Sequence, residues 1–264
     1  MASGTDLLTV RHLTVQFGGL TAINDLSLEV RPREIVGVIG PNGSGKTTLF
    51  NCITGLYRAT AGSIAFGSPP AELAHLAPHD IVEAGISRTF QTLRVFANLS
   101  VLENVLVGVH CRRRAGVLGA IFRPSWVVIE ETESVQRARE LLGIFGDRLV
   151  PRTTWPARSL SYANRRRLEI ARALATNPRL LLLDEPTAGM NPTEKQELTG
   201  VIRTIRDRGV TVLLIEHDMR VVMQTADRVI AMNYGERIAE GRPEEVARDP
   251  IVVEAYLGKM ASGA

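Results

Sequence analysis

The chain has 264 residues, a net charge of +3 and a hydrophobic content of 45%. These values predict a packed globular core, and they argue against general disorder and against a nucleic-acid-binding protein. Two cysteines without CxxC spacing favour a reducing compartment over a disulfide scaffold or a zinc site, and Cys52 is expected in the core of a helix. No signal-peptide pattern and no apolar stretch of ~20 residues is found, so we expect a cytosolic protein that meets a membrane only through partners.

The predicted elements alternate between strands and helices. Alternating apolar and polar residues predict antiparallel strands at Thr9–Phe17, Ser27–Val30 and Gly62–Gly67. Short, wholly apolar runs predict buried parallel strands at Ile35–Ile39, Leu180–Leu183 and Val210–Ile215. Helices are expected at Thr47–Ile53, Val101–Val109, Ile129–Leu142, Ala163–Thr176, Pro192–Arg208 and near Val252–Leu257. This order predicts an α/β fold with a small antiparallel β subdomain at its N-terminal edge.

The middle of the chain departs from this alternation. We interpret about residues 92–158 as a helical insertion and about residues 235–264 as a C-terminal extension of one domain that spans 1–264. Inside the insertion, Gly116–Trp126 is apolar and rich in glycine. The basic runs Arg112–Arg114 and Arg165–Arg167 are interpreted as solvated helix faces or partner contacts rather than nucleic-acid patches.

A glycine-rich segment between a predicted strand and helix matches the P-loop pattern G-x-x-x-x-G-K-[ST]. It consists of Gly40, Pro41, Asn42, Gly43, Ser44, Gly45, Lys46, Thr47 and Thr48. Glycines let backbone N–H groups approach phosphate oxygens, and the following helix N-terminus adds a partial positive charge. Lys46 is one of only three lysines, beside Lys195 and Lys259, in a chain whose other cations are arginines. A slender ammonium is required at this position, and Lys46 is expected to reach the β- and γ-phosphates of ATP.

A second motif is the apolar strand that ends in Asp184 and Glu185. A carboxylate at the end of such a strand is how a P-loop protein presents a ligand to Mg²⁺, and the Thr47 hydroxyl is a further ligand. Asp184 is therefore predicted to hold Mg²⁺, directly or through water. Glu185 is expected to accept a proton from the attacking water.

The segment Leu160–Asn164, followed by a helix rich in arginine, resembles the signature of the ATP-binding cassette family. The resemblance covers nearly the whole chain and implies a P-loop NTPase (RecA-like) core with an inserted α-helical subdomain. It implies that Phe17 stacks on adenine, that Gln91 senses Mg²⁺ and the attacking water, and that His217 binds the γ-phosphate. The alternatives are a core position for Phe17 or His217 and an ordinary loop residue at Gln91.

The family forms a sandwich dimer, in which each ATP lies between one subunit's P-loop and the other's signature segment. The signature residues that would complete the partner's nucleotide site are Ser161, Tyr162, Ala163 and Asn164. The family pattern has two glycines and a glutamine at the last three positions, and Asn191 stands where Asp is common. Because a methyl group at Ala163 would crowd the backbone near phosphate, we expect a functional but suboptimal site.

Further segments resemble the longer ATPase subunit of the branched-chain amino acid importers. They are Phe17–Ala22, Ser87–Gln91, Ile215–Met219, Ala255–Gly258 and the apolar insertion Val107–Val128. Importers of urea or other amides share many of these, and the lipopolysaccharide exporter shares the ending.

The implied partners are a second ATPase subunit, two membrane permeases and, through them, an extracytoplasmic binding protein, at the cytoplasmic face of the cell membrane. A permease helix is expected to dock beside Gln91 and Thr92–Ser100. Leu93, Val95 and Phe96 would form either the floor of that groove or part of the internal core, and Gly116–Val128 would either rest on the permease or fold back.

Overall fold

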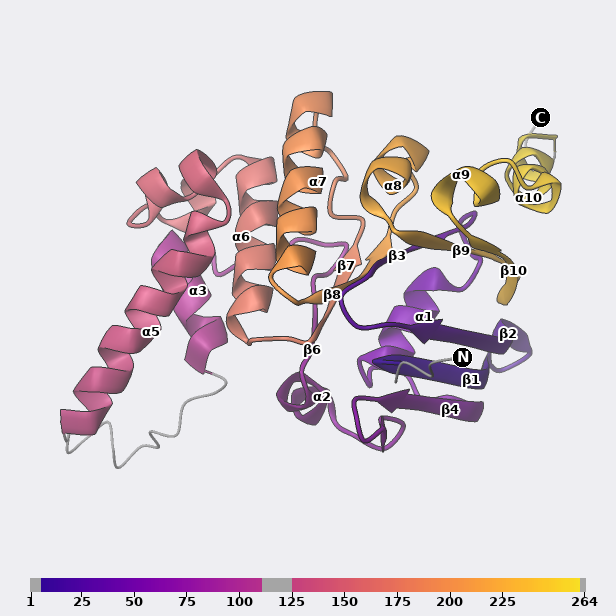
Figure 1. Cartoon of the computed structure of the whole chain (residues 1–264), viewed down its shortest axis with the longest axis horizontal. Helices are drawn as coiled ribbons and strands as arrows, with labels where there is room; N and C mark the ends of the chain where they lie inside the picture. The colour runs from indigo at the N-terminus through magenta and orange to yellow at the C-terminus, as the bar shows by residue number, and fades with distance from the viewer. Residues whose placement is uncertain (1–5, 111–124, 262–264) are drawn as a thin grey trace.

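The computed structural model describes residues 6–110 and 125–261, which form two sheets and several surrounding helices (Figure 1). The larger sheet has the strand order β10-β9-β3-β8-β7-β6 and is parallel except for β10, which runs antiparallel to β9. Its strands are β3 (Ile35–Ile39), β6 (Ile86–Arg88), β7 (Leu180–Asp184), β8 (Thr211–Ile215), β9 (Arg228–Asn233) and β10 (Glu236–Gly241). Every residue of β3, β7 and β8 is buried, so the three strands predicted from apolar runs are confirmed.

The smaller sheet is antiparallel, with the order β2-β1-β4-β5. Its strands are β1 (Leu8–Phe17), β2 (Leu20–Val30), β4 (Ala61–Phe66) and β5 (Ala71–Glu72). Strand β2 starts seven positions before the predicted Ser27. The simple alternation fails there because the register shifts around Leu13 and Asp25 adopts a left-handed φ of 49°.

Helix α1 (Lys46–Ile53) lies between the two sheets and joins them into one core. Its Leu49, Phe50 and Ile53 are fully buried against strands of both sheets. Cys52 is 4% exposed in the same helix, and burial raises the pKa of its thiol to about 11. The core position predicted for this cysteine is confirmed, whereas Cys111 lies outside the described residues.

The opposite face of the larger sheet carries a second core. Along β7, Leu180 and Leu182 pack on the α1 side, while Leu181 and Leu183 pack on the other side. This second side is covered by α6 (Tyr162–Ala175) and α7 (Pro192–Asp207), and the same core continues into α3 (Val101–His110) and α5 (Ser125–Gly143). Figure 1 shows α3 and α5 at the end of the molecule away from the smaller sheet.

The remaining described helices are short or lie near the C-terminus. They are α2 (Pro78–Ala84), α8 (Met219–Thr225), α9 (Pro243–Val246) and α10 (Pro250–Ala261), with three 3₁₀ turns between Gly146 and Ser159. Across residues 6–110 and 125–261, no helix is long and apolar enough to cross a membrane. The predicted apolar segment Gly116–Trp126 falls largely outside the described residues, as does Arg112–Arg114.

The interpretation of the basic run on α6 is wrong for Arg166 and Arg167. Arg165–Arg167 were expected on a solvated face or a partner contact, but Arg166 and Arg167 are 0% and 1% exposed. Arg166 pairs with Glu169 at 2.9 Å, and Arg167 pairs with Glu197 at 2.8 Å. A run of like charges in sequence is therefore distributed around the helix, because successive residues point in different directions.

Candidate functional site

The loop between β3 and α1 has the backbone geometry that its glycines predict. Gly40, Gly43 and Gly45 have φ values of 149°, 82° and 100°. A Cβ at Gly40 would lie 2.1 Å from the Met232 carbonyl oxygen, and one at Gly45 would lie 2.7 Å from the Ala22 carbonyl oxygen. Residues with a Cβ atom are excluded at both positions, so glycine is required for the loop to pack against these carbonyl groups as it enters the helix.

Lys46 lies inside the turn of this loop. Its ammonium donates hydrogen bonds to the carbonyl oxygens of Gly40 (2.7 Å) and Pro41 (2.9 Å) and to Ser44 Oγ (3.2 Å). Helix α1 begins after Gly45, which makes no side-chain cap hydrogen bond, so the positive end of the helix dipole faces this loop and can attract an anion. Among the neighbouring loop residues, Asn42, Gly43 and Thr47 are exposed, Thr48 is half-buried and Pro41 is buried.

Asp184 ends β7 and is 2% exposed. Its Oδ2 accepts a hydrogen bond from Arg88 Nη2 at 2.8 Å, and Arg88 also donates to Asn51 Oδ1 on α1 at 2.6 Å. Sequence reasoning missed this arginine, although it lies in the segment that carries the family resemblance. The pair balances a buried carboxylate and fixes its orientation beside α1.

The oxygen-rich set predicted for Mg²⁺ is chemically suited to that ion. Mg²⁺ is commonly held by one or two carboxylates together with substrate phosphates and water, and rarely by an all-protein cage. Asp184 offers a carboxylate, Thr47 a hydroxyl on the first turn of α1, and Gln91 an exposed amide oxygen. Within the described residues, no cluster of three or more His, Cys, Asp or Glu side chains forms a separate metal site.

Glu185 has a left-handed backbone, with φ of 46°. Such a conformation is uncommon outside glycine and is frequent at functional sites. Its N–H donates to the Ile215 carbonyl at 2.9 Å, and its Oε2 lies 3.7 Å from His217 Nδ1. The His217 side chain is 61% exposed, so the core alternative for this histidine is wrong.

Directly before His217 in the chain is a glutamate to which the sequence analysis assigned no role. Glu216 is fully buried, and its Oε1 accepts hydrogen bonds from the Thr187 N–H (3.0 Å) and Oγ1 (2.7 Å). Within the described part of the chain, its Oε2 has no hydrogen-bond partner. Burial, the largest cause, raises the pKa of Glu216 above its ordinary value. Glu216 thereby anchors the loop that follows Glu185.

Phe17 ends β1 with 46% of its surface exposed, so the alternative of a core position is wrong. Its ring meets the Tyr57 ring edge-on, at 5.1 Å between centroids. Tyr57 follows α1 and donates its N–H to the Asn51 carbonyl. An exposed aromatic pair therefore lies beside the helix that begins at the P-loop.

The segment after β6, residues 90–94, is here called the Q-loop. Two buried side chains of α6 hold its backbone. Arg166 donates to the carbonyl oxygens of Phe90 and Gln91, and Glu169 accepts from the N–H groups of Phe90 (3.4 Å) and Arg94 (3.2 Å). The helix that follows the signature segment is thus tied to the loop that carries Gln91, which remains exposed.

The signature segment itself is only partly exposed. Ser161 caps α6 by accepting a hydrogen bond from the Asn164 N–H at 3.3 Å, and the exposed Tyr162 accepts one from Arg166 at 3.1 Å through its hydroxyl. Ala163 is 4% exposed and packs in the second core. Its methyl group does not face outward, so the predicted crowding of phosphate by this methyl is wrong. Asn191 caps α7 and is exposed.

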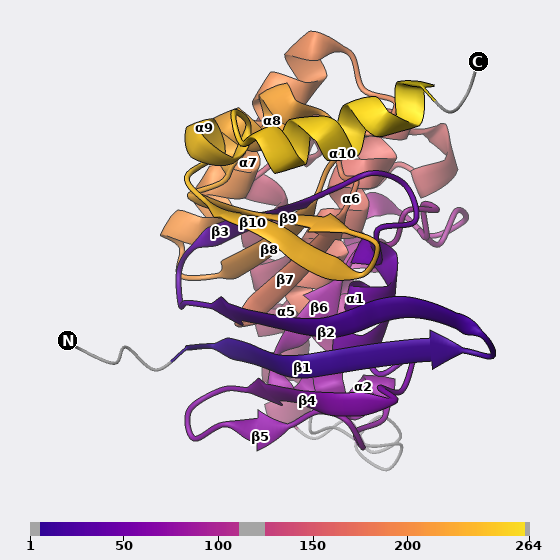
Figure 2. The same cartoon turned by 90° about the vertical axis from the view of Figure 1, so that its right-hand side faces the viewer.

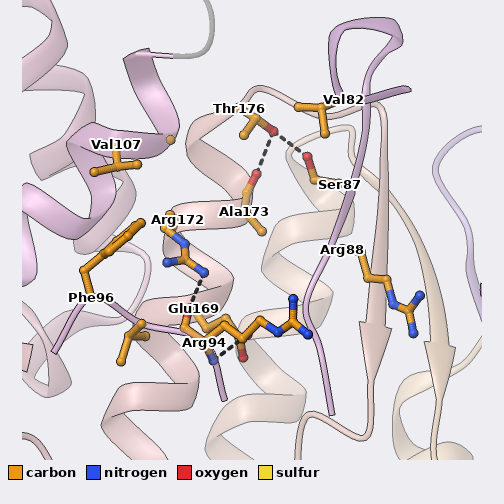
Figure 3. A pocket seen from close by; sticks show the side chains of 12 residues that line it. Val82, Ser87, Arg88, Arg94, Phe96, Val107, Glu169, Arg172, Ala173 and Thr176 are labelled. Carbon is orange, nitrogen blue, oxygen red and sulfur yellow. Dashed lines mark hydrogen bonds between the residues drawn. The ribbon is translucent and has the colours of Figure 1, made fainter. Parts of the chain in front are cut away.

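A groove of about 510 Å³ opens beside the Q-loop (Figure 3). Its lining comes from the Q-loop region, α3, α6 and the strand β6, and includes Arg94, Val95, Phe96, Val107, Glu169 and Arg172. Phe96 is 48% exposed, and the Arg172 guanidinium lies 5.3 Å from the centre of its ring. The sequence left open whether these apolar residues form the floor of a groove or part of the core. Phe96 lines the open groove, whereas Val95 lines the groove and also packs against the second core.

Comparisons with known proteins cover nearly the whole chain. A family model described as "ABC transporter" matches residues 23–188, and one described as "Branched-chain amino acid ATP-binding cassette transporter" matches residues 236–262. The chain is 43% identical to the "High-affinity branched-chain amino acid transport ATP-binding protein LivG" of Salmonella typhimurium, over 96% of this chain and 98% of that protein. It is 41% identical to BraF of Pseudomonas aeruginosa, a protein of the same description, again over 96% and 98%.

Solved structures agree with these matches. The ADP conformation of MJ1267, an ATP-binding cassette of an ABC transporter, is 34% identical with a TM-score of 0.83, over 96% of this chain and 99% of that one. The dimeric structure of the bacterial cassette MJ0796 is 25% identical with a TM-score of 0.73, over 89% and 98%. The predicted fold class, an α/β P-loop NTPase core with an antiparallel β subdomain and a helical subdomain, is confirmed.

Proposed function

Because the chain belongs to the ABC transporter family of ATP-binding subunits, we propose that it hydrolyses Mg-ATP to energise a branched-chain amino acid importer. The observation that carries the proposal is the loop wrapped around Lys46, together with Asp184, which Arg88 links to α1, and the Glu185–His217 pair. The relatives over nearly the full length are named as branched-chain amino acid transport proteins, which supports the choice of cargo.

In the proposed site, the P-loop N–H groups and Lys46 bind the phosphates of ATP. The lysine exchanges bonds to the Gly40 and Pro41 carbonyls for bonds to phosphate oxygens, so its ammonium is never left unpaired. The remaining P-loop residues, Asn42, Gly43, Ser44, Gly45, Thr47 and Thr48, line the same turn. Phe17 offers an exposed ring face to adenine.

Glu185 is the proposed general base and accepts a proton from the attacking water. His217 lies 3.7 Å from its carboxylate and orients that water and the γ-phosphate. Gln91, which is exposed in the Q-loop, is proposed to sense Mg²⁺ and the same water. Thr47, Gln91 and Asp184 would hold Mg²⁺, which neutralises charge on the phosphates when bound.

A second ATPase subunit is proposed to complete the site, as in a sandwich dimer. The partner would bring Ser161, Tyr162 and Asn164 to the γ-phosphate, with the N-terminus of its α6 as an anion site. Ala163 would contribute through its backbone only, because its side chain lies in the core. The dimeric solved structure of a related cassette supports this arrangement.

The test of the proposal is Glu185→Gln, which keeps the shape of the side chain and removes the base. We expect turnover to fall by about 10²–10⁴-fold while ATP binding persists, and ATP to drive dimerisation measured by size-exclusion chromatography. Lys46→Ala is the matched control, because it should abolish binding and dimerisation together. Undiminished turnover in Glu185→Gln would remove this residue from the base role.

The groove beside the Q-loop is the proposed docking site for a permease helix, at the cytoplasmic face of the membrane. The apolar side chains of Phe96 and Val107 in its lining suit a helix face, and Arg94 and Arg172 in the same lining suit acidic side chains (Figure 3). Phe96→Asp should prevent assembly with the two permeases while ATP binding and the melting temperature stay near wild type. Loss of folding instead would assign Phe96 to the core.

The cargo is tested in the assembled transporter, with two permeases and an extracytoplasmic binding protein. We expect ATP-dependent uptake of radiolabelled leucine into vesicles, absent in the Glu185→Gln transporter. Uptake of urea or an amide without leucine would favour a related importer. Outward movement of lipopolysaccharide would favour the exporter. That alternative rests only on the shared Ala255–Gly258 ending.

A further inference from the structure

The C-terminal helix α10 packs against the end of β3, immediately before the P-loop (Figure 2). Val252 and Tyr256 are four residues apart and lie on one face of the helix. Val252 is 3% exposed in a small apolar cluster that includes Ile39, the last residue of β3, and Tyr256 packs against the same cluster. The helix therefore covers the strand end from which the phosphate-binding loop departs.

The Tyr256 side chain extends this contact to the loop itself. Its hydroxyl accepts a hydrogen bond from the Gly40 N–H at 2.8 Å, across 216 positions of sequence. The Gly40 carbonyl accepts from Lys46 at 2.7 Å, so the two polar groups of this residue are held by different elements. Burial raises the pKa of Tyr256, which keeps the phenol protonated near neutral pH.

The backbone of Gly40 has little freedom to change its conformation. Its φ of 149° is in the region that favours glycine, and a Cβ there would meet both the Met232 carbonyl and Ser44 Oγ. Without Tyr256, the Gly40 N–H would be a buried donor in need of another acceptor, and such groups are costly to leave unpaired. Movement of the peptide to find one would also move the Gly40 carbonyl and the lysine bound to it.

We propose that Tyr256 is a positioning residue for ATP binding, which fixes the first peptide of the P-loop through its hydroxyl. The C-terminal helix thereby acts on the affinity of the nucleotide site through the backbone of Gly40. The role rests on the proposed function, because it presupposes that the P-loop binds ATP. The tyrosine lies in the stretch matched by the branched-chain family model, outside the part matched by the general ABC transporter model.

The test is Tyr256→Phe in the full chain, which removes one oxygen and keeps the ring in its apolar cluster. The Kd for ATP, measured by calorimetry without Mg²⁺ so that no hydrolysis occurs, should rise about three- to tenfold. In the assembled transporter, KM for ATP should rise by a similar factor, with kcat within about twofold of wild type.

Val252→Ala is the matched control, because it loosens the same helix without touching Gly40. It should lower the melting temperature at least as much as Tyr256→Phe does, yet leave the Kd for ATP within about twofold of wild type. Unchanged affinity in Tyr256→Phe, or equal weakening in both variants, would overturn the positioning role. A wild-type chain that binds no ATP would overturn the proposed function as well, so the two failures are distinguishable.

Discussion

Two helix N-termini in this molecule are candidate anion sites, and they are built differently. Helix α1 starts at Gly45 with no side-chain cap, while the preceding loop folds around Lys46. Helix α6 starts at Ser161, whose hydroxyl already accepts a hydrogen bond from the first turn. The candidate site at α1 is built from residues of one chain. At α6 the Ser161 hydroxyl already pairs with one N–H of the first turn, so the proposed phosphate of a partner subunit would have to replace that cap.

The second site differs also in what supports it. The P-loop is held by local turns, by contacts to strands and by Tyr256 of α10, whereas α6 is held by the fully buried pair Arg166 and Glu169. That pair also holds the Q-loop backbone on both its donor and acceptor sides. A disturbance at the signature helix should therefore reach Gln91, and a disturbance in the P-loop should not.

The largest expected effect comes from breaking the buried pair. Arg166→Met leaves Glu169 buried without its cation, and we expect a loss of about 3–5 kcal/mol in the free energy of unfolding. Amide protons of Phe90 and Arg94, which donate to Glu169, should exchange faster in hydrogen-exchange measurements. Urea denaturation supplies the stability, and the exchange data locate the change in the Q-loop.

Arg165→Met is the matched control on the same helix. Arg165 is half-buried and donates through its Nε to the Leu160 carbonyl. We expect it to cost no more than about 1.5 kcal/mol and to leave the Q-loop amides protected. The double variant Arg166→Met with Glu169→Leu should be more stable than Arg166→Met alone, since no uncompensated charge remains. A single variant as stable as the control would contradict the link.

A smaller effect is expected from the cap of α6. Ser161→Ala should cost about 1 kcal/mol of stability and also weaken ATP-driven dimerisation in the Glu185→Gln background. The matched control is Ser100→Ala, because Ser100 accepts a hydrogen bond from the Glu103 N–H at the start of α3. Both should lower the melting temperature alike, and only Ser161→Ala should raise the ATP concentration needed for dimers. Equal dimerisation would remove Ser161 from the composite site.

The two regions also differ in how far sequence predicts them. The P-loop is one continuous segment from Gly40 to Thr48, so its glycines and its lysine are enough to predict its geometry from the local sequence. The side chains that hold the P-loop and the Q-loop come from distant positions in the sequence. Tyr256 bonds Gly40 across 216 residues, and Arg166 bonds Phe90 across 76. Nothing local distinguishes Arg166 from a solvated arginine, and the burial of the Ala163 methyl depends on how α6 packs in the second core.

The smallest effect concerns Glu216, whose hydrogen bonds to Thr187 anchor the loop between Glu185 and α7. Because burial raises its pKa in the folded state, its contribution to stability is fully present below the unfolded value and is lost as pH rises through the folded value. Glu216→Gln keeps the acceptor oxygen for Thr187 and removes the charge. The variant should therefore escape the loss of stability that the wild type suffers at higher pH.

Thermal unfolding at about pH 5 and about pH 8 measures this difference. The melting temperature of Glu216→Gln relative to wild type should increase from the lower to the higher pH, because only the wild type must keep a carboxylate charged in the core. Asp218→Asn is the control in the same segment. Its pKa is lowered, chiefly by the hydrogen bond from Lys195, so removal of its charge should cost stability at both pH values. A constant offset between Glu216→Gln and wild type would mean that Glu216 does not change its protonation state in this range.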